Sequence, residues 1–205
     1  IDGDYILVAV GRETRSALES VKVENTGLEI NEEGFIDTDS QMKASENIFV
    51  IGDAAGRPML AHKAYREGKV AGEVAAGEST GMDSQFIPKV MYTDPEVAVV
   101  GLSEQEGKEK HNDIKVGRFS MKHSGRALTT NGGNGFVKVI ASGENKILGV
   151  TIISERASDM IAEATLALEM QAYLDDVIGT VHAHPTFPEG FQEACEDALD
   201  KSIHT

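Results

Sequence analysis

The segment HAHPTFPE, residues 182 to 189, places two histidines, two prolines and a carboxylate within eight residues. These residue types are consistent with three kinds of site. The first is a metal site, because His182 and His184, at positions i and i+2, would share one face of an extended segment. A stable metal site needs further ligands, and the sequence does not indicate where they would come from.

The second interpretation is structural, because Thr186-Phe187-Pro188-Glu189 matches a helix capping box. In that motif the Thr hydroxyl accepts from the backbone N–H of Glu189, and the Glu carboxylate accepts from the Thr N–H. Pro188 would lie in the first turn, where its missing donor costs little. This interpretation accounts for Thr186 and Glu189 without any chemistry, but it leaves the histidines unexplained.

The third interpretation is an acid–base pair. Pro185 disfavours helical geometry for His184, and Glu189 could accept a hydrogen bond from one nitrogen of its ring. The other nitrogen would then be free to take a proton, and an imidazole with an ordinary pKa of about 6.5 suits that task near neutral pH. The residues alone leave all three interpretations open.

A second candidate site is IGDAAG, residues 51 to 56. Asp53 would lie at the carboxyl end of a buried strand, where open α/β sheets bind ligands and a carboxylate can accept from sugar or polyol hydroxyls. A turn or cap role is an equal alternative. The sequence contains no G-x-G-x-x-G, P-loop or G-x-S-x-G motif, and Gly132-Gly133-Asn134-Gly135 is interpreted as a hairpin turn.

The composition of the 205 residues indicates a globular protein, since 40% are hydrophobic. The net charge of -15 opposes binding to nucleic acid or anionic membranes. No apolar run approaches the roughly 20 residues that cross a bilayer. The single cysteine excludes a disulfide framework and a Cys-rich zinc site. Because the chain begins at Ile1 without a methionine, we expect processing or truncation.

The first part of the chain has the pattern of a partial α/β unit. Tyr5 to Val10 is a continuous apolar run, which predicts a strand buried on both faces. Further strands are expected at 34–37 and 47–51, and a helix is expected at 60–76. The sequence GESTGMDS, residues 77 to 84, is the best candidate for a linker.

The second part predicts an antiparallel sheet with helices on one face, so the whole chain is assigned to the α+β class. Ser142 to Asn145 predicts a hairpin turn. Cys195 lies on the apolar side of the last helix, which starts near Phe187, and is expected in the core. The predicted strands are 89–92, 97–100, 114–120, 135–141 and 147–153, and the predicted helices are 103–110 and 157–173.

The helix expected at 157–173 is apolar on two sides. One stripe would face its own sheet. The second stripe contains Ala162, Leu166 and Met170, which suggests cover from a partner subunit.

Taken together, these segments resemble the dihydrolipoamide dehydrogenases, which belong to the flavin-dependent pyridine nucleotide-disulfide oxidoreductases. The matching segments occur in family order and extend over essentially the whole chain. They are LVAVGR at 7–12, NIFVIGDAAGRPMLAHKAYREG at 47–68, YTDPEVAVVGLSEQE at 92–106, NGFVKVI at 134–140, LGVTII at 148–153 and HAHPTFPE at 182–189.

The resemblance implies a role for particular residues and implies FAD and NAD as cofactors, with no metal. His184 matches the acid–base residue and Glu189 matches the residue that orients it, and the peptide bond between His184 and Pro185 is expected to be cis. Asp53 matches a residue that binds the ribityl chain of FAD, and Gly11 matches a position that meets NAD. The positions that match the flavin lining are Met59, Leu60, Ala61 and His62.

The resemblance also implies an architecture. Residues 1–12 would end the NAD-binding domain, residues 13–84 would form the C-terminal part of the FAD-binding domain, and residues 85–205 would form the dimerisation domain of a homodimer. The redox cysteine pair and the glycine-rich loops would lie upstream of Ile1, so this chain alone is expected to be inactive and, in solution, a colourless dimer.

The reaction implied is oxidation of dihydrolipoamide, presented by the lipoyl domain of 2-oxo-acid dehydrogenase complexes. The compartment implied is the cytoplasm, or the mitochondrial matrix in a eukaryote. Two alternatives stay open. One is a free-standing dimerisation module of this fold, and the other is a related disulfide reductase for another thiol substrate.

Overall fold

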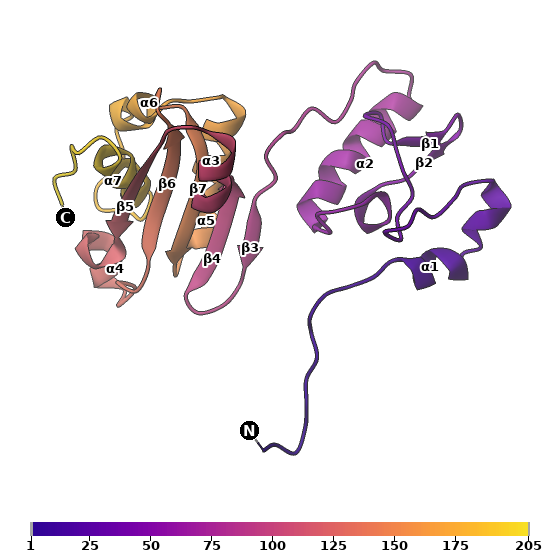
Figure 1. The fold of residues 1–205 in the computed structure, drawn as a ribbon, viewed down its shortest axis with the longest axis horizontal. Coiled ribbons are helices and arrows are strands. Elements are labelled where there is room, and N and C mark those ends of the chain that lie inside the picture. The colour runs from indigo at the N-terminus through magenta and orange to yellow at the C-terminus, as the bar shows by residue number, and fades with distance from the viewer. Residues whose placement is uncertain (1, 205) are drawn as a thin grey trace. The chain divides into compact units, whose positions relative to one another are not determined.

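A computed structural model describes residues 2–204 of the chain, which form two compact units divided between Asp83 and Ser84 (Figure 1). This division falls next to the boundary expected between residues 84 and 85. Each unit has its own hydrophobic clusters, so each is described by itself. Within residues 2–204, no helix is both long and apolar enough to span a membrane.

The first unit is built on one long helix and a small hairpin. Helix α2, Ala61–Ala75, confirms the helix expected at 60–76. It packs on the turn η2, and β1 pairs antiparallel with β2. The other elements of the unit are short. The bounds are α1 Arg15–Ser20, η1 Val23–Thr26, β1 Lys43–Ser45, β2 Ile48–Phe49 and η2 Gly52–Ala55.

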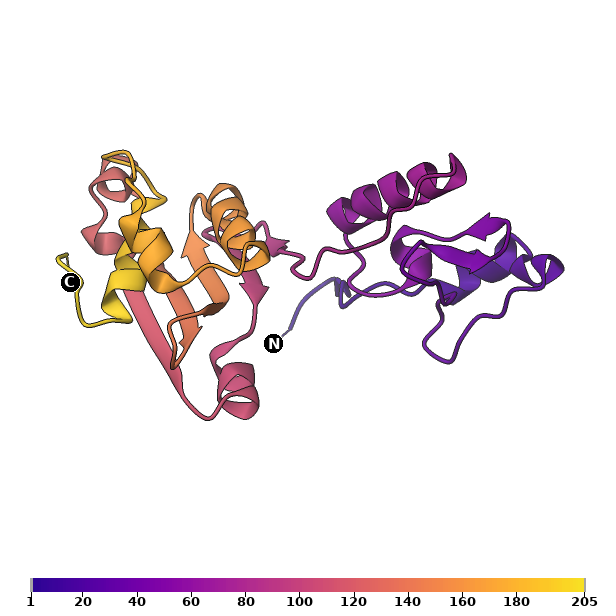
Figure 2. The same ribbon diagram turned by 90° about the horizontal axis from the view of Figure 1, so that it is seen from above.

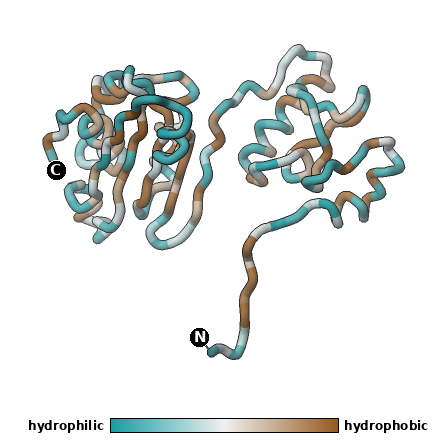
Figure 3. The backbone as a smooth tube through the Cα atoms, viewed as in Figure 1, coloured by the Kyte–Doolittle hydropathy of each residue, from teal (hydrophilic) through white to brown (hydrophobic). Residues whose placement is uncertain are grey.

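The strand expected at Tyr5 to Val10 is not formed. This segment is extended coil, and Figure 3 shows it as a hydrophobic stretch of the chain. Its large apolar side chains are 73–95% exposed. A strand buried on both faces needs neighbours that pair with its backbone and cover its side chains, and no described strand pairs with these residues. The prediction was therefore wrong for this chain, although the apolar pattern is real.

Of the two other strands predicted in this unit, one is absent and one is shorter than expected. Residues 34–37 form no strand, although Phe35 and Ile36 are buried and the Ile36 N–H donates to the Ala54 carbonyl over 2.9 Å. The strand expected at 47–51 shrinks to β2, whose two residues are only half-buried. Local packing replaces a full hydrogen-bonded ladder in both segments.

The second unit contains a five-stranded antiparallel sheet with the order β3-β4-β7-β6-β5. The hairpin predicted at residues 142–145 joins β6 to β7 and is confirmed. All five predicted strands are present, within a residue or two of the expected ends. The bounds are β3 Lys89–Met91, β4 Glu96–Gly101, β5 Ile114–Ser120, β6 Phe136–Ser142 and β7 Ile147–Ser154.

Two helices cover one face of this sheet and enclose the main core. Helix α5, Ala157–Glu169, packs on β4 and β7, and helix α7, Glu189–Asp197, packs on β5 and β6. Alternate residues of β6, Val137, Val139 and Ala141, are fully buried against them. Cys195 of α7 belongs to the same cluster and is completely buried, as expected.

Helices are not confined to one face, which corrects the prediction. Helix α3, Glu104–Lys110, contacts the alternate residues of β6 that point away from the main core. Lys138 pairs with Glu104 over 3.2 Å, and a Cβ on Gly107 would lie 3.2 Å from the Ile140 side chain. The views in Figures 1 and 2 place α3 and α5 on opposite sides of the sheet.

Short helices were missed by the sequence analysis. They are α1, α4 Gly125–Thr129 and α6 Leu174–Gly179, together with the 3-10 turns η1 and η3 Met121–His123. The glycine-rich segment at 132–135 links α4 to β6 and is therefore not a hairpin turn. The helix expected at 157–173 ends at Glu169, because Gln171 has a positive φ of 55° and Tyr173 already precedes α6.

The two apolar stripes of α5 have different environments. Met160, Ile161 and Leu168 are buried against the sheet, whereas Leu166 is 62% exposed and Met170, the residue after the helix, is 72% exposed. This chain covers one stripe and leaves the other open.

The close contact between α7 and β5 generates a stability prediction. A Cβ on Gly117 would lie 2.0 Å from the Ala194 carbonyl oxygen and 2.4 Å from the Ala198 nitrogen, so only glycine fits. Gly117→Ala should destabilise the second unit by about 1–3 kcal/mol or more, measured by urea unfolding. Gly179→Ala, where a Cβ meets nothing within 4 Å, is the control and should change stability by less than about 0.5 kcal/mol. Equal stability of the two variants would contradict the close contact.

Candidate active site

The segment between α6 and α7 carries the histidines singled out from the sequence. It is fixed at its end by Phe187 and Phe191, which are 7% and 1% exposed and anchor the start of α7 in the main core. The peptide bond between His184 and Pro185 is cis, as expected. The buried side chains of Phe187 and Phe191 hold the polar residues of the segment next to α7.

His184 and Glu189 lie together, as the acid–base interpretation predicts. Nδ1 of His184 is 2.8 Å from Oε1 of Glu189, and the Thr186 N–H donates to Oε2 over 2.6 Å. The His184 side chain is 77% exposed and that of Glu189 is 27% exposed. Both carboxylate oxygens therefore have a partner, one from the ring and one from the backbone.

Only half of the predicted capping box is formed. The Glu189 carboxylate accepts from the Thr186 N–H, but the Thr186 hydroxyl donates to the Ala183 carbonyl over 2.7 Å instead of accepting from Glu189. Pro188 takes the N-cap position. The chain bends at residues 184–185, which places the Ala183 carbonyl within hydrogen-bond distance of the Thr186 hydroxyl.

His182 has a different environment from His184. Its side chain is 6% exposed, Nε2 lies 2.8 Å from Oε1 of Glu163 on α5, and Nδ1 lies 3.0 Å from the Thr180 carbonyl. Both ring nitrogens of His182 are thus occupied by the protein. Its contacts tie the segment to α5, and no group of metal-ligating side chains includes the two histidines within residues 2–204.

The geometry of His184 suits proton transfer. A carboxylate on Nδ1 favours the tautomer with its proton on that nitrogen, and it stabilises the imidazolium when a second proton arrives. Within residues 2–204, no hydrogen bond occupies Nε2. His184 and Glu189 both line a cavity of about 260 Å³, so a proton donor has space next to the pair.

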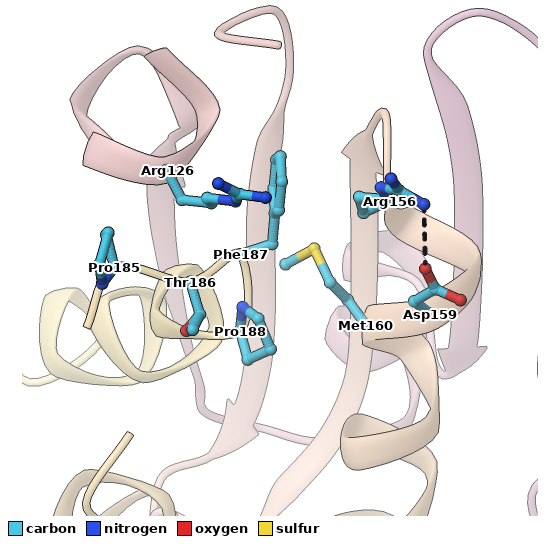
Figure 4. Close-up of a pocket in the computed structure, with 8 residues that line it drawn as sticks. All are labelled: Arg126, Arg156, Asp159, Met160, Pro185, Thr186, Phe187 and Pro188. Atoms are coloured by element: carbon cyan, nitrogen blue, oxygen red, sulfur yellow. Dashed lines mark ion pairs between the residues drawn. The ribbon is translucent and has the colours of Figure 1, made fainter. Parts of the chain in front are cut away.

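A second cavity, of about 440 Å³, lies beside residues 185–188 (Figure 4). Its other walls come from Arg126, Arg156, Asp159 and Met160. Arg156 pairs with Asp159 over 3.7 Å, and both side chains are largely exposed. His184 does not line this cavity, so the acid–base pair belongs to the smaller one.

Cys195 takes no part in either cavity. Burial raises the pKa of its thiol far above the ordinary value, and the negative charges of Glu163 and Glu196 add to that effect. A thiol that stays protonated is a poor nucleophile. The core role expected from the sequence fits this environment.

The residues expected to bind cofactor lie in the first unit. Asp53 is in η2 and forms an ion pair with Arg12 over 2.8 Å, and Arg12 also donates to the Met59 carbonyl. Gly11 precedes this arginine with a φ of 143° and is exposed. The structure therefore brings together three of the predicted regions through Arg12, a residue the sequence analysis did not select.

The other predicted cofactor residues surround the start of α2. Leu60 is its N-cap, and Ala61 and His62 are in its first turn. The Leu60 side chain makes no cap hydrogen bond at this helix start. The Asp53 side chain is 37% exposed, and its carboxylate is a group that can accept hydrogen bonds from polyol hydroxyls.

A buried ion pair holds the IGDAAG turn against α2. Lys63 and Glu67 are 7% and 4% exposed, and their charged atoms are 2.7 Å apart. Oε2 of Glu67 accepts from the Gly52 N–H over 2.7 Å, and Lys63 donates to the Gly52 and Gly56 carbonyls over 3.4 and 3.2 Å. The only sequence signal for this brace was a Lys–Glu pair at i and i+4.

Comparison with known proteins identifies the class to which this fold and site belong. The family model described as pyridine nucleotide-disulphide oxidoreductase, dimerisation domain, matches residues 87–195, and the model described as pyridine nucleotide-disulphide oxidoreductase matches residues 1–68. The chain therefore belongs to the pyridine nucleotide-disulphide oxidoreductase family and carries its dimerisation domain. The resemblance inferred from the sequence is confirmed.

The particular relatives are more specific. The chain is 45% identical over its whole length to dihydrolipoyl dehydrogenase 3 of Haloarcula marismortui, and 46% identical over 98% of its length to the dihydrolipoyl dehydrogenase of Thermus scotoductus. It spans 43% of the length of each relative.

Solved structures share the fold. The flavoprotein disulfide reductase RclA from Escherichia coli has a TM-score of 0.84 at 22% identity, covering 92% of this chain and 44% of that one. LpdA from Mycobacterium tuberculosis has a TM-score of 0.79 at 20% identity, covering 90% of this chain and 40% of that one.

The buried brace of the IGDAAG turn can be tested by hydrogen exchange. Glu67→Gln leaves the Lys63 charge buried without its partner, which should cost about 3–5 kcal/mol locally. We expect faster amide exchange at residues 51–56, measured by mass spectrometry. The double variant Lys63→Met with Glu67→Leu should recover part of the protection, and Lys69→Met, at an exposed position of the same helix, should change nothing. Unchanged exchange in Glu67→Gln would mean that the pair does not hold the turn.

Proposed function

We propose that this chain is the C-terminal part of a dihydrolipoamide dehydrogenase, in which His184 is the acid–base residue for oxidation of dihydrolipoamide. The observation that carries the proposal is the contact of His184 Nδ1 with Glu189 over 2.8 Å, in a ring that lines a cavity of about 260 Å³. The support from relatives is their 45–46% identity over nearly the whole chain.

The step assigned to this chain is a proton transfer. Nε2 of His184 takes the proton of a dihydrolipoamide thiol, and Glu189 stabilises the resulting imidazolium through Nδ1. The thiolate then attacks an enzyme disulfide, forming a mixed disulfide and releasing one cysteine as thiolate. That disulfide has to be supplied from outside this chain, because the single cysteine, Cys195, is buried.

The first unit is assigned to cofactor binding. We infer that Asp53 accepts from the ribityl hydroxyls of FAD, that Met59, Leu60, Ala61 and His62 lie along the flavin, and that Gly11 meets NAD. Bound FAD supplies the electron transfer from the cysteine pair to NAD. Arg12 would have to release or share Asp53, since it occupies that carboxylate in this structure.

The second unit is assigned to a homodimer interface. Leu166 and Met170 form the open apolar stripe, and a partner subunit would cover them. In such a dimer the His184 pair would face the flavin and disulfide of the other subunit. The further partner proposed is the lipoyl domain of a 2-oxo-acid dehydrogenase complex, and the proposed compartment is the cytoplasm or, in a eukaryote, the mitochondrial matrix.

The dimer can be tested on the 205-residue chain by analytical ultracentrifugation. We expect a mass near twice 22.0 kDa. Met170→Glu should weaken the dimer at least about tenfold, because a charge would be buried in the apolar stripe. Val21→Glu is the matched control, since both side chains are 72% exposed but Val21 lies in the first unit. A monomeric wild-type chain, or an equal effect of both variants, would remove the assigned interface.

The acid–base role can be tested in the complete enzyme that contains this chain. His184→Gln should lower dihydrolipoamide oxidation by about 10²- to 10⁴-fold while leaving the flavin bound, as measured by steady-state kinetics and the visible spectrum. His111→Gln, outside the cavity of the pair, is the control and should retain activity. Unchanged turnover in His184→Gln would remove this residue from the mechanism. A wild-type enzyme that oxidises another dithiol in preference would favour the related disulfide reductase instead.

A further inference from the structure

A second imidazole–carboxylate pair lies beside the first. Nδ1 of His204 is 2.5 Å from Oε1 of Glu193. Glu193 is on α7, one turn after Glu189, so both carboxylates project from the same face of the helix. His204 comes from the segment that follows α7. The sequence analysis selected neither residue.

The two pairs share one cavity. His184, Glu189, Glu193 and His204 all line the space of about 260 Å³, and Phe119 and residues 123–125 form the rest of its lining. The ionisable groups around this space are the four members of the pairs, together with His123 of η3 and Glu196 of α7, which acts on His204 from a greater distance. A change of charge on one pair therefore changes the electrostatic potential at the other pair, as the effect of Glu189 on His204 illustrates.

Glu193 is the least exposed of the four residues that make up the two pairs. Its side chain is 13% exposed, and its Oε2 is buried without a hydrogen-bond partner among the described residues. A desolvated carboxylate with one unpaired oxygen depends on its remaining partner for compensation. That partner is His204, whose pKa is raised by the hydrogen bond to Glu193 and by the charge of that carboxylate.

We propose that Glu193 and His204 are positioning residues that set the proton affinity of His184. With His204 protonated, the second pair is an imidazolium–carboxylate couple with little net charge towards the cavity. If His204 is replaced, the negative charge of Glu193 is no longer compensated and acts on His184. If Glu193 is replaced, that negative charge is absent, and His204 remains as a histidine that can become positive. The catalytic meaning of this tuning rests on the acid–base role proposed for His184, whereas the tuning itself does not.

The proposal predicts shifts of opposite sign. His204→Gln should raise the titration midpoint of His184, because the uncompensated Glu193 carboxylate favours the imidazolium. Glu193→Gln should lower it, because that carboxylate is gone and His204 repels a second positive charge. Shifts of about half a pH unit are expected for partly exposed groups at this kind of separation. In the double variant the two changes should largely cancel.

The measurement is a histidine ring titration by ¹H–¹⁵N NMR on the intact 205-residue chain. His184→Gln identifies the His184 signals, and the backbone spectra show whether each variant keeps its fold. Opposite shifts that cancel in the double variant support the proposal. Shifts of the same sign, or no shift in either folded variant, overturn it and leave the second pair as a tether of the terminal segment.

This experiment is independent of the activity test. If His184→Gln retains activity while the NMR shifts are as expected, the proposed function fails and the tuning stands. If His184→Gln is inactive while the titration midpoint of His184 is the same in the wild-type, Glu193→Gln and His204→Gln chains, the proposed function stands and the tuning fails.

Discussion

The carboxylate of Glu189 is shared between a side chain and the backbone, and the geometry of the candidate site depends on that sharing. Oε1 holds the His184 ring, and Oε2 accepts the Thr186 N–H at the start of α7. The ring orientation and the helix start are therefore fixed by one group. The rest of the second unit holds that group in place, since Phe191 anchors α7 in the core and Gly117 allows the helix to touch β5.

The same use of a carboxylate recurs in the first unit. One oxygen of Glu67 accepts a hydrogen bond from the Gly52 N–H, and the other forms an ion pair with Lys63. In both places a backbone donor fixes one oxygen, so that the other points in a defined direction towards a nitrogen-bearing side chain. The difference is in solvent. Glu67 is buried, which suits a permanent brace, whereas His184 is exposed, which suits a group that exchanges protons.

The fold could be predicted from the sequence where hydrophobic periodicity is long and locally complete. The five strands of the second sheet, α2 and most of α5 follow from such patterns. The prediction of a strand at Tyr5 to Val10 was wrong because a buried strand needs neighbouring strands that pair with its backbone, in addition to an apolar sequence. The short helices α1, α4 and α6 were not predicted because five or six residues are too few to show a helical hydrophobic periodicity.

The candidate site could be predicted only where its partners are close in sequence. His184 and Glu189 are five residues apart, and the motif contains both. Arg12 reaches Met59 across 47 positions, and no local pattern announces that contact. His204 and Glu193 were missed for the same reason, since a turn after α7 has to bring them together.

The burial of Cys195 has a consequence for selectivity. The family to which this chain belongs is named for disulphide oxidoreduction, so any accessible thiol near the site could compete with the substrate. Cys195 is sealed in the core and kept in its neutral form, so it neither captures an oxidised partner as a dead-end adduct nor advances along the series of sulfur oxidation states. The chain thus contributes no accessible thiol that could compete with a sulfur substrate at the proposed acid–base pair.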